Sequence, residues 1–181
     1  MSKNIVVLSG SPRKDGNTDK LADALVKSAK SEGAKVELFR VADMNISGCK
    51  GCGYCRSSGG VCVQKDDMPQ ILETLKSADA VVFASPVYYF GMTAQLKLAI
   101  DRFYAQQKEG FPIKRAALLM TCGNSMPDVA EGAVATYKNI LAYQKWENAG
   151  IIIAAGLHSA DEIDGRPELM EAQKLGKELF L

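Results

Sequence analysis

The feature that most limits how this chain can fold is a regular alternation of short aliphatic runs with longer amphipathic stretches. The aliphatic runs have the length of buried strands, whereas the longer stretches carry apolar residues three and four positions apart, as one face of a helix does. Strands that alternate with helices pair in parallel, and the helices cover both faces of the sheet. The alternation therefore predicts one doubly wound α/β domain. Its expected strands are Asn4–Ser9, Lys35–Phe39, Ala80–Ala84, Arg115–Thr121 and Ile151–Ala155, and its expected helices are Thr18–Ser31, Pro69–Ser77, Thr93–Gln107, Asp128–Asn148 and Pro167–Phe180.

The composition is that of a soluble globular protein, with 47% hydrophobic and 24% charged residues. Because 22 basic residues balance 21 acidic ones, the net charge of +1 gives no reason to expect a nucleic-acid or membrane partner. The apolar stretch near the N-terminus is too short for a signal peptide, and no stretch has transmembrane length. We therefore expect one cytoplasmic domain over residues 1–181.

A loop suited to an anion follows the first expected strand and leads directly into a helix. It runs from Gly10 to Thr18 with the sequence GSPRKDGNT. Its small residues let backbone N–H groups converge, and Ser11, Asn17 and Thr18 offer side-chain donors. Arg13 adds a full positive charge to the partial charge of the helix N-terminus. The pattern matches neither the P-loop nor the dinucleotide motif. We interpret it as a phosphate site, and the alternative is a plain Gly/Ser turn with a helix cap.

Two more strands end in loops that suit a flat aromatic ligand. The third expected strand leads into SPVYYFGMT, where Tyr88 and Tyr89 can wall a ring and Gly91 allows close backbone approach. Such aromatics, taken alone, more often belong to a core or an interface. The fourth strand ends in the small polar loop Thr121–Ser125. Because parallel strands end at one edge of the sheet, we expect these loops to share a ligand with a phosphate and a planar ring. Flavin mononucleotide (FMN) has this shape.

Four of the five cysteines lie in one short run, CKGCGYCRSSGGVC. They are Cys49, Cys52, Cys55 and Cys62. In a reducing compartment, clustered thiols serve as metal ligands rather than as disulfides. Four soft sulfur donors suit a [4Fe–4S] cluster or a tetrahedral zinc ion. The two-residue gaps on both sides of Cys52 favour the cluster, while zinc and a loop without metal are the alternatives.

Several other residues are expected to have structural roles. The single histidine, His158, excludes a multi-histidine metal site, and we place it in the loop after the fifth strand without a catalytic role. Any difficult chemistry must then come from the cysteines or from a bound organic cofactor. Cys122 is expected to be a small buried residue, and Trp146 to pack in the core. Asp66 and Asp67 are expected to cap the helix that begins at Pro69.

Three segments together resemble the NADPH-dependent FMN reductase group of flavodoxin-like proteins. They are GSPRKDGNT, SPVYYFGMTAQLKLAIDRF and the cysteine run followed by VQKDDM. Within that group the chain is most similar to the iron–sulfur flavoproteins, over nearly its whole length. The resemblance implies a flavodoxin-like three-layer sandwich, with helices on both faces of a five-stranded parallel sheet in the order 2-1-3-4-5. It makes residues 43–68 a cysteine-rich loop inserted after the second strand.

The resemblance also implies which residues hold the cofactors. The FMN phosphate would be bound by Ser11, Arg13, Asn17 and Thr18. The isoalloxazine ring would be lined by Pro86, Val87, Tyr88, Tyr89 and Gly91, and at its other edge by Thr121, Cys122 and Gly123. Cys49, Cys52, Cys55 and Cys62 would ligate a [4Fe–4S] cluster close enough to exchange electrons with the flavin. Aerobic purification is expected to lower the cluster content.

The expected function is that of an FMN-dependent oxidoreductase that takes hydride at flavin N5 from NADPH or NADH, with no side chain as acid or base. A second hypothesis is an electron-transfer flavoprotein that lacks a nicotinamide site and is served by a ferredoxin-like donor. A third is a structural or interaction protein with a zinc–thiolate site. The expected acceptor is a small molecule or a protein, and the resemblance implies a homodimer or homotetramer.

Overall fold

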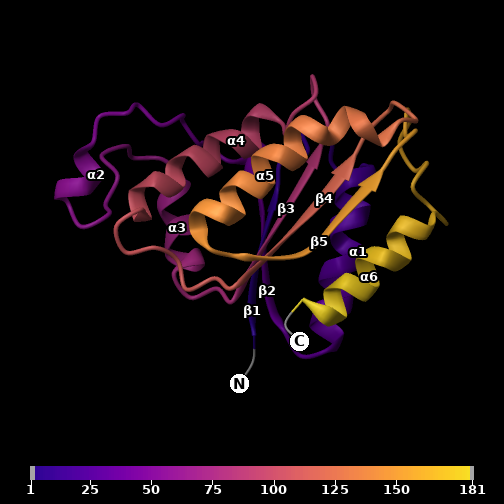
Figure 1. The fold of residues 1–181 in the computed structure, drawn as a ribbon, viewed down its shortest axis with the longest axis horizontal. Helices are drawn as coiled ribbons and strands as arrows, with labels where there is room; N and C mark the ends of the chain where they lie inside the picture. The colour runs from indigo at the N-terminus through magenta and orange to yellow at the C-terminus, as the bar shows by residue number, and fades with distance from the viewer. Residues whose placement is uncertain (1–2, 180–181) are drawn as a thin grey trace.

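The computed structural model describes residues 3–179, which form a five-stranded parallel sheet in the order β2-β1-β3-β4-β5 (Figure 1). Every neighbouring pair of strands runs in parallel. The strand order confirms the flavodoxin-like sheet. Because β1 lies between β2 and β3, the loops after β1 and β3 leave the sheet side by side, at its switch point. The strands are β1 (Asn4–Ser9), β2 (Lys35–Arg40), β3 (Ala80–Pro86), β4 (Arg115–Thr121) and β5 (Glu147–Ala154).

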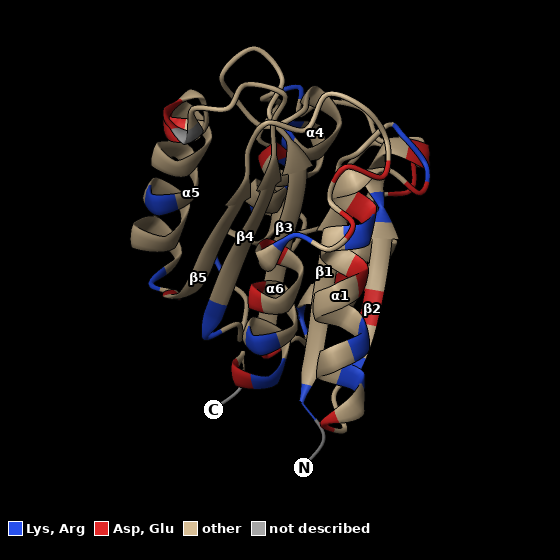
Figure 2. Ribbon diagram, turned by 90° about the vertical axis from the view of Figure 1, so that its right-hand side faces the viewer, with Lys and Arg blue, Asp and Glu red and all other residues tan. Residues whose placement is uncertain are grey.

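Helices cover both faces of the sheet. Figure 2 shows α1 and α6 side by side on one face, with charged residues along them and largely uncharged strands behind. Helices α3, α4 and α5 cover the other face (Figure 1). Within residues 3–179, no helix combines the length and the apolar character needed to cross a membrane. The helices are α1 (Asn17–Ser31), α2 (Tyr54–Ser57), α3 (Met68–Leu75), α4 (Ala94–Asp101), α5 (Glu131–Gln144) and α6 (Pro167–Glu178), with 3-10 turns η1 (Val41–Asp43), η2 (Arg102–Gln106) and η3 (Pro127–Ala130).

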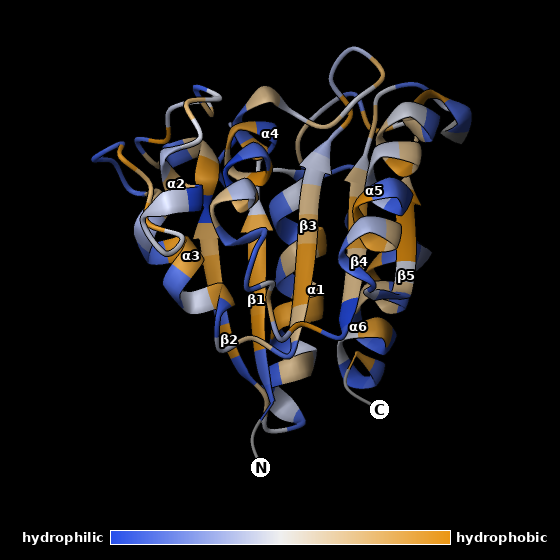
Figure 3. Ribbon diagram, turned by 60° about the vertical axis from the view of Figure 1, so that its left-hand side comes forward, coloured by the Kyte–Doolittle hydropathy of each residue, from blue (hydrophilic) through white to orange (hydrophobic). Residues whose placement is uncertain are grey.

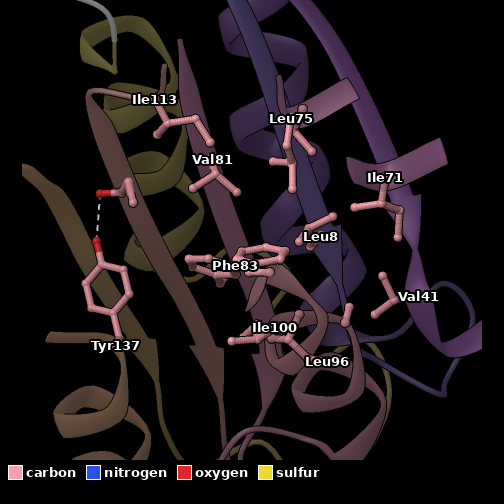
Figure 4. Packing of buried hydrophobic residues seen from close by; sticks show 14 of the residues in the cluster. Leu8, Val41, Ile71, Leu75, Val81, Phe83, Leu96, Ile100, Ile113 and Tyr137 are labelled. Atoms are coloured by element: carbon pink, nitrogen blue, oxygen red, sulfur yellow. Dashed lines mark hydrogen bonds between the residues drawn. The ribbon is translucent and has the colours of Figure 1, made fainter. Parts of the chain in front are cut away.

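Each face of the sheet has its own hydrophobic core, and the strands between them are apolar on both sides (Figure 3). Under α4 and α5, the ring of Phe83 lies 6.3 Å from the rings of Phe103 and Tyr137. The buried Tyr137 hydroxyl donates a hydrogen bond of 2.6 Å to the Ala116 carbonyl (Figure 4). Burying one such large side chain contributes roughly 1.5–3 kcal/mol. These two cores hold the strand ends, and therefore the loops that follow them, in fixed positions.

The prediction for the long helix over Asp128–Asn148 and for the fifth strand was wrong at their junction. The helix was expected to reach Asn148, but α5 ends at Gln144, and Lys145 adopts a left-handed conformation with φ of 59°. Strand β5 begins at Glu147 and pairs with Arg115 of β4. The first residues of β5 are polar and largely exposed because they lie on an edge strand, so they lack the apolar run that predicts a buried strand.

Three smaller differences concern helix boundaries. Helix α4 changes into the 3-10 turn η2 at Arg102, instead of continuing as one α-helix to Gln107 as expected. The loop expected over residues 43–68 contains the short helix α2. Helix α6 ends at Glu178, and Phe180, the expected last helical residue, lies outside the described residues. Trp146 packs in the core as expected.

Candidate functional site

A cavity of about 220 Å³ opens where the loops after β1, β3, β4 and β5 meet. It lies at the carboxyl ends of the strands, where doubly wound sheets bind their ligands. Of the residues predicted to contact FMN, all except Tyr89 and Gly91 line it. The cavity is lined by Ser11, Arg13, Gly16, Asn17, Thr18, Pro86, Val87, Tyr88, Thr121, Cys122, Gly123, Leu157 and His158.

The loop after β1 is fixed against α4 by a close backbone contact at Gly10. The Thr93 hydroxyl donates to the Gly10 carbonyl at 2.9 Å, and the Gly10 N–H donates to the Ala84 carbonyl at 2.8 Å. A Cβ at position 10 would lie 2.5 Å from Thr93 Oγ1 and 2.6 Å from Leu96 Cβ, which is closer than atoms can pack. Only glycine therefore lets the loop lie this close to α4.

The N-terminus of α1 reaches the cavity without a side-chain cap. Its N-cap residue is Gly16, which has no side chain to accept from the first N–H groups of the helix. The buried hydroxyls of Thr18 and Thr121 share a hydrogen bond of 2.6 Å, which ties α1 to the end of β4. Ser11, also buried, donates its hydroxyl to the Arg13 carbonyl at 3.1 Å. An uncapped helix N-terminus beside hydroxyls and an arginine is well suited to bind an anion.

Asn17 lines the cavity, but both ends of its side-chain amide already have partners. Its Nδ2 donates to the Ser159 carbonyl at 2.7 Å, and its Oδ1 accepts from the Ile163 N–H at 3.2 Å. Asn17 thus joins the loop after β1 to the loop after β5. This places it at the cavity while giving its amide a structural role.

Beneath the first loop, opposite charges compensate each other. The buried Asp19 carboxylate accepts hydrogen bonds from Ser9 Oγ, at 3.1 Å, and from Arg40. Arg40 also donates to the Ser11 carbonyl at 3.2 Å and to Asp43 at 3.0 Å. Burial acts to lower the pKa of Arg40, but hydrogen bonds to the two carboxylates outweigh it and raise that pKa. Arg40 therefore stays charged and supports the loop from below.

The loop after β3 turns back sharply at Tyr89 and Phe90. Tyr88 and Gly91 exchange two backbone hydrogen bonds, of 3.0 and 3.1 Å, and the two residues between them have φ of 48° and 67°. Such a two-residue turn favours Asn-Gly and strains bulky side chains. Tyr89 is 99% exposed and does not line the cavity, whereas Tyr88 does. The contact of Tyr89 and Gly91 with a flavin ring stays a prediction.

Cys122, after β4, forms a buried part of the cavity wall. Its thiol donates to the Asn124 carbonyl at 3.5 Å, and its backbone bonds to Ala154 and Leu157 connect the ends of β4 and β5. Burial raises the pKa of the Cys122 thiol, although a backbone hydrogen bond from Gly156 opposes the shift. A neutral thiol is a poor nucleophile, so this position fits the small buried residue that was expected.

Three lining residues were absent from the sequence prediction: Gly16, Leu157 and His158. His158 was expected in the loop after β5, but not at the ligand cavity. Glu162 fixes this loop by accepting the N–H groups of His158, at 2.6 Å, and of Ser159, at 3.1 Å. These hydrogen bonds also lower the pKa of Glu162. Applying the strand-end rule to the fifth strand, as to the other three, would have identified Leu157 and His158.

The cysteine loop, residues 43–68, lies beside η2 at the far end of the molecule from α6 (Figure 1). Its four cysteines are free thiols: Cys49 and Cys52 are exposed, and Cys55 and Cys62 are partly buried. Glycines 51, 53, 59 and 60 in this loop all have positive φ, which lets the backbone turn repeatedly. Within residues 3–179, no group of three or more Cys, His, Asp or Glu side chains is close enough together to hold a metal ion.

The base of the cysteine loop is held by a buried ion pair that the sequence did not reveal. The Arg102 guanidinium donates to both carboxylate oxygens of Asp66, at 2.7 and 3.1 Å. Asp66 also accepts from the N–H groups of Ser47, at 3.0 Å, and Met68, at 3.2 Å. Asp66 thus accepts from the first N–H of α3, whereas Asp67, the N-cap residue, makes no side-chain cap hydrogen bond and accepts from the Asn45 N–H instead. Burial acts to raise the pKa of Asp66, but the hydrogen bonds from Arg102, Ser47 and Met68, together with the charge of Arg102, outweigh it and lower that pKa.

The strand order and the cavity define a flavodoxin-like protein with a cavity at its strand ends. Residues 3–152 match the family model for NADPH-dependent FMN reductases. The chain is 34% identical over 176 residues to an iron–sulfur flavoprotein of Archaeoglobus fulgidus, a match that covers 96% of this chain and 77% of that one. It is 31% identical over 156 residues to an iron–sulfur flavoprotein of Methanosarcina thermophila, covering 86% and 78%. The chain therefore belongs to the NADPH-dependent FMN reductase family of FMN-dependent oxidoreductases.

Solved structures support the same fold. The NAD(P)H:quinone oxidoreductase from Methanothermobacter marburgensis superimposes with a TM-score of 0.80 at 21% sequence identity, covering 100% of this chain and 98% of that one. At this level of identity the similarity concerns the fold. It confirms the flavodoxin-like architecture that the sequence predicted.

Proposed function

We propose that this protein is an NAD(P)H-dependent oxidoreductase that binds FMN in the strand-end cavity and a [4Fe–4S] cluster on the cysteine loop. One observation carries the flavin part of the proposal: the loops after β1, β3 and β4 converge on a single cavity. They bring together an uncapped helix N-terminus and an aromatic wall, which suit the two ends of FMN. Membership of the FMN reductase family supports the same cofactor.

The proposed phosphate end lies at the N-terminus of α1. Here Ser11, Arg13, Asn17 and Thr18 line the cavity, and the first N–H groups of the helix have no side-chain cap. Arg13 supplies a full positive charge to a phosphate and the helix supplies a partial one. Because the amide of Asn17 is already engaged, we expect it to hold the loops in place rather than to be the main phosphate donor.

The proposed ring end lies between the loops after β3 and β4. Pro86, Val87 and Tyr88 form one wall, and Thr121, Cys122 and Gly123 form the other. Tyr89 and Gly91 are proposed to contact the ring from the turn at its edge. The chemistry that bound FMN supplies is hydride acceptance at N5. The residues of the chain bind and orient the ring and exclude water from one side of it, and none is proposed as an acid or base.

The donor set of the cysteine loop fits an iron–sulfur cluster. Four thiols on one glycine-rich segment are the soft ligands that such clusters require. The thiols are not gathered in this structure, but the positive φ values around them show a backbone that turns at glycines between and beside the ligands. Cys49, Cys52, Cys55 and Cys62 are the proposed ligands, and the chemistry that a bound cluster supplies is one-electron transfer.

NADPH or NADH is the proposed electron donor, and a quinone-like small molecule or a protein is the proposed acceptor. A homodimer or homotetramer in the cytoplasm is also proposed, where a reducing environment would keep the four thiols available. The exposed Tyr89 and Phe90, 99% and 63% accessible, offer apolar surface for such an assembly.

The proposal is tested by purifying the protein anaerobically and measuring flavin, iron, sulfide and zinc on one sample. We expect one FMN per chain, with iron and sulfide in equal amounts. Mixing with NADPH or NADH should then bleach the flavin absorbance. Bleaching only by a reduced ferredoxin would instead support the electron-transfer protein, and stoichiometric zinc without flavin would overturn the proposal.

A further inference from the structure

The cysteine loop rests on the 3-10 turn η2. The Gln106 side chain donates to the Gly60 carbonyl at 3.3 Å, and the Arg56 guanidinium lies 5.3 Å from the centre of the Tyr104 ring. Gly60 has φ of 86°, and a Cβ there would lie 3.0 Å from the Ala105 carbonyl oxygen, so glycine suits this close approach. Turn η2 therefore forms the floor under the segment that carries the cysteines.

Arg102, the first residue of η2, closes the base of this loop from inside the protein. Its side chain is only 1% exposed, and that of Asp66 only 4%. One guanidinium nitrogen donates to the Ser47 carbonyl at 2.8 Å and to Asp66 at 2.7 Å, and the other terminal nitrogen donates to Asp66 at 3.1 Å. Ser47 precedes Cys49 and Asp66 follows Cys62, so Arg102 connects the two ends of the cysteine run.

The ion pair leaves part of the guanidinium unused. Arg102 Nε is buried and has no hydrogen-bond partner among residues 3–179. Burial acts to lower the pKa of Arg102. The interactions with Asp66, and weaker ones with the Cys62 side chain, together outweigh burial and raise that pKa. Cys62 thus lies close enough to the guanidinium for the two groups to interact electrostatically. The ion pair with Asp66 alone does not explain this buried N–H donor without a partner.

We propose that Arg102 is a positioning residue for the cluster, placing a buried positive charge near Cys62 and a spare N–H donor at the base of the cysteine loop. The inference rests on the proposed function, because it needs the cluster on the cysteine loop. One-electron reduction adds one negative charge to the cluster and its thiolates. A fixed cation and N–H···S hydrogen bonds stabilise that added charge and so raise the reduction potential. Asp66 and Ser47 hold the guanidinium in place for this role.

The experiment compares the wild type with three variants after anaerobic reconstitution with iron and sulfide. Asp66→Asn leaves the Arg102 charge uncompensated, whereas Arg102→Met combined with Asp66→Asn removes both charges. Arg56→Met is the matched control, because it removes an exposed cation from the same loop. Iron and sulfide per chain are measured first, and the cluster is then titrated at fixed potentials by EPR spectroscopy.

The expected shifts have opposite signs. In the double variant the ratio of reduced to oxidised cluster falls at least tenfold at a given potential. For one electron, this corresponds to a reduction potential that is lower by about 59 mV. In Asp66→Asn the ratio rises, and in Arg56→Met it changes by less than about twofold, because solvent screens an exposed charge. If the substitutions only loosened the loop, both Asp66→Asn and the double variant would lose iron, and their reduction potentials would not shift in opposite directions.

Two results would contradict this inference, and they are distinguishable. A wild-type protein that takes up no iron overturns the proposed cluster, and the role of Arg102 with it. An unchanged ratio in the double variant, at full iron and sulfide content, overturns the role of Arg102 alone. Melting temperature and FMN content report whether each variant folds. If the double variant does not fold, Arg102→Lys replaces it: retained iron with a ratio within about twofold of wild type supports the charge role, and a tenfold change overturns it.

Discussion

The strand-end cavity and the cysteine loop are constructed in different ways. The walls of the cavity follow directly from buried strands, and hydrogen bonds such as Thr18–Thr121, at 2.6 Å, already join its loops. The cysteine loop has exposed thiols at Cys49 and Cys52 and is held mainly at its base, by Arg102 and Asp66. One region therefore has its shape before any ligand binds, whereas the other has a fixed base and an adaptable middle.

The two regions therefore differ in how much of their backbone is fixed by the rest of the fold. A phosphate and a planar ring need rigid donors and walls, which the sheet supplies at its switch point. Four thiolates that close around a cluster need a backbone that can turn, which glycines supply. The buried ion pair fixes the base of the same loop.

The largest effect is expected at the base of the cysteine loop. Asp66→Ala leaves the buried Arg102 charge without its partner, and breaking such a pair costs about 3–5 kcal/mol. Urea unfolding of the protein should show this loss in the free energy of unfolding. As a control, Glu73→Ala removes the exposed pair with Lys76 and should cost only about 0–1 kcal/mol. Equal losses in the two variants would show that the base of the loop is not specially anchored.

The same ion pair predicts how stability depends on pH. Because the folded-state pKa of Asp66 is lowered, its contribution is fully present above the unfolded-state pKa of about 3.9 and is lost as pH falls through the folded-state pKa. The stability difference between wild type and Asp66→Asn should therefore be constant near neutral pH and shrink below about pH 4. Unfolding curves across this range measure it, and a difference that grows in acid would contradict the assignment.

A smaller effect is expected where the first loop contacts α4. Gly10→Ala places a Cβ 2.5 Å from Thr93 Oγ1, and such overpacking costs about 1–3 kcal/mol. The loop should shift and FMN affinity should fall by about tenfold or more, which corresponds to about 1.4 kcal/mol. Fluorescence titration with FMN checks this. Gly48→Ala, which meets only the flexible end of Leu98, should bind FMN normally. Unchanged FMN affinity in Gly10→Ala would mean that the cavity is less rigid than described.

The smallest effect is a gain in stability at the turn beside the cavity. Replacing Tyr89 by Asn and Phe90 by Gly gives both positions residues that accept positive φ, and relief of strain should add about 1 kcal/mol. Thermal and urea unfolding measure the gain. Tyr54→Asn, an exposed aromatic without positive φ, should give no gain. A loss of stability in the double variant would show that aromatic contacts outweigh the strain.

Much of the fold could be predicted because its signals are local in the sequence. The aliphatic runs predicted the five strands, and the strand-end rule then placed the loops of the cavity together. The start of β5 was missed because Glu147 begins a polar edge strand, where the chain carries no apolar signal. The ring contact predicted for Tyr89 rests on its place in an aromatic run, and that run did not reveal the turn with positive φ that leaves Tyr89 exposed.

The Arg102–Asp66 pair could not be predicted because its partners lie 36 residues apart in the chain. Asp66 was interpreted as a helix cap, and it does accept from Met68, but its second role appears only when η2 packs under the cysteine loop. A local pattern cannot reveal a contact that tertiary packing creates. Tertiary contacts such as the Arg102–Asp66 pair determine the environment of the four thiols, whereas the local cysteine spacing only shows which thiols are candidates.

The central claim is that the flavin cavity is formed by the sheet and does not depend on the cysteine loop. The most direct test is the FMN dissociation constant of a variant in which Cys49, Cys52, Cys55 and Cys62 are all replaced by alanine. Wild type and variant are measured in the same anaerobic buffer, together with their iron content. We predict that the variant loses its iron and binds FMN within about twofold of wild type, a difference of about 0.4 kcal/mol. Loss of FMN binding together with the iron would contradict the account.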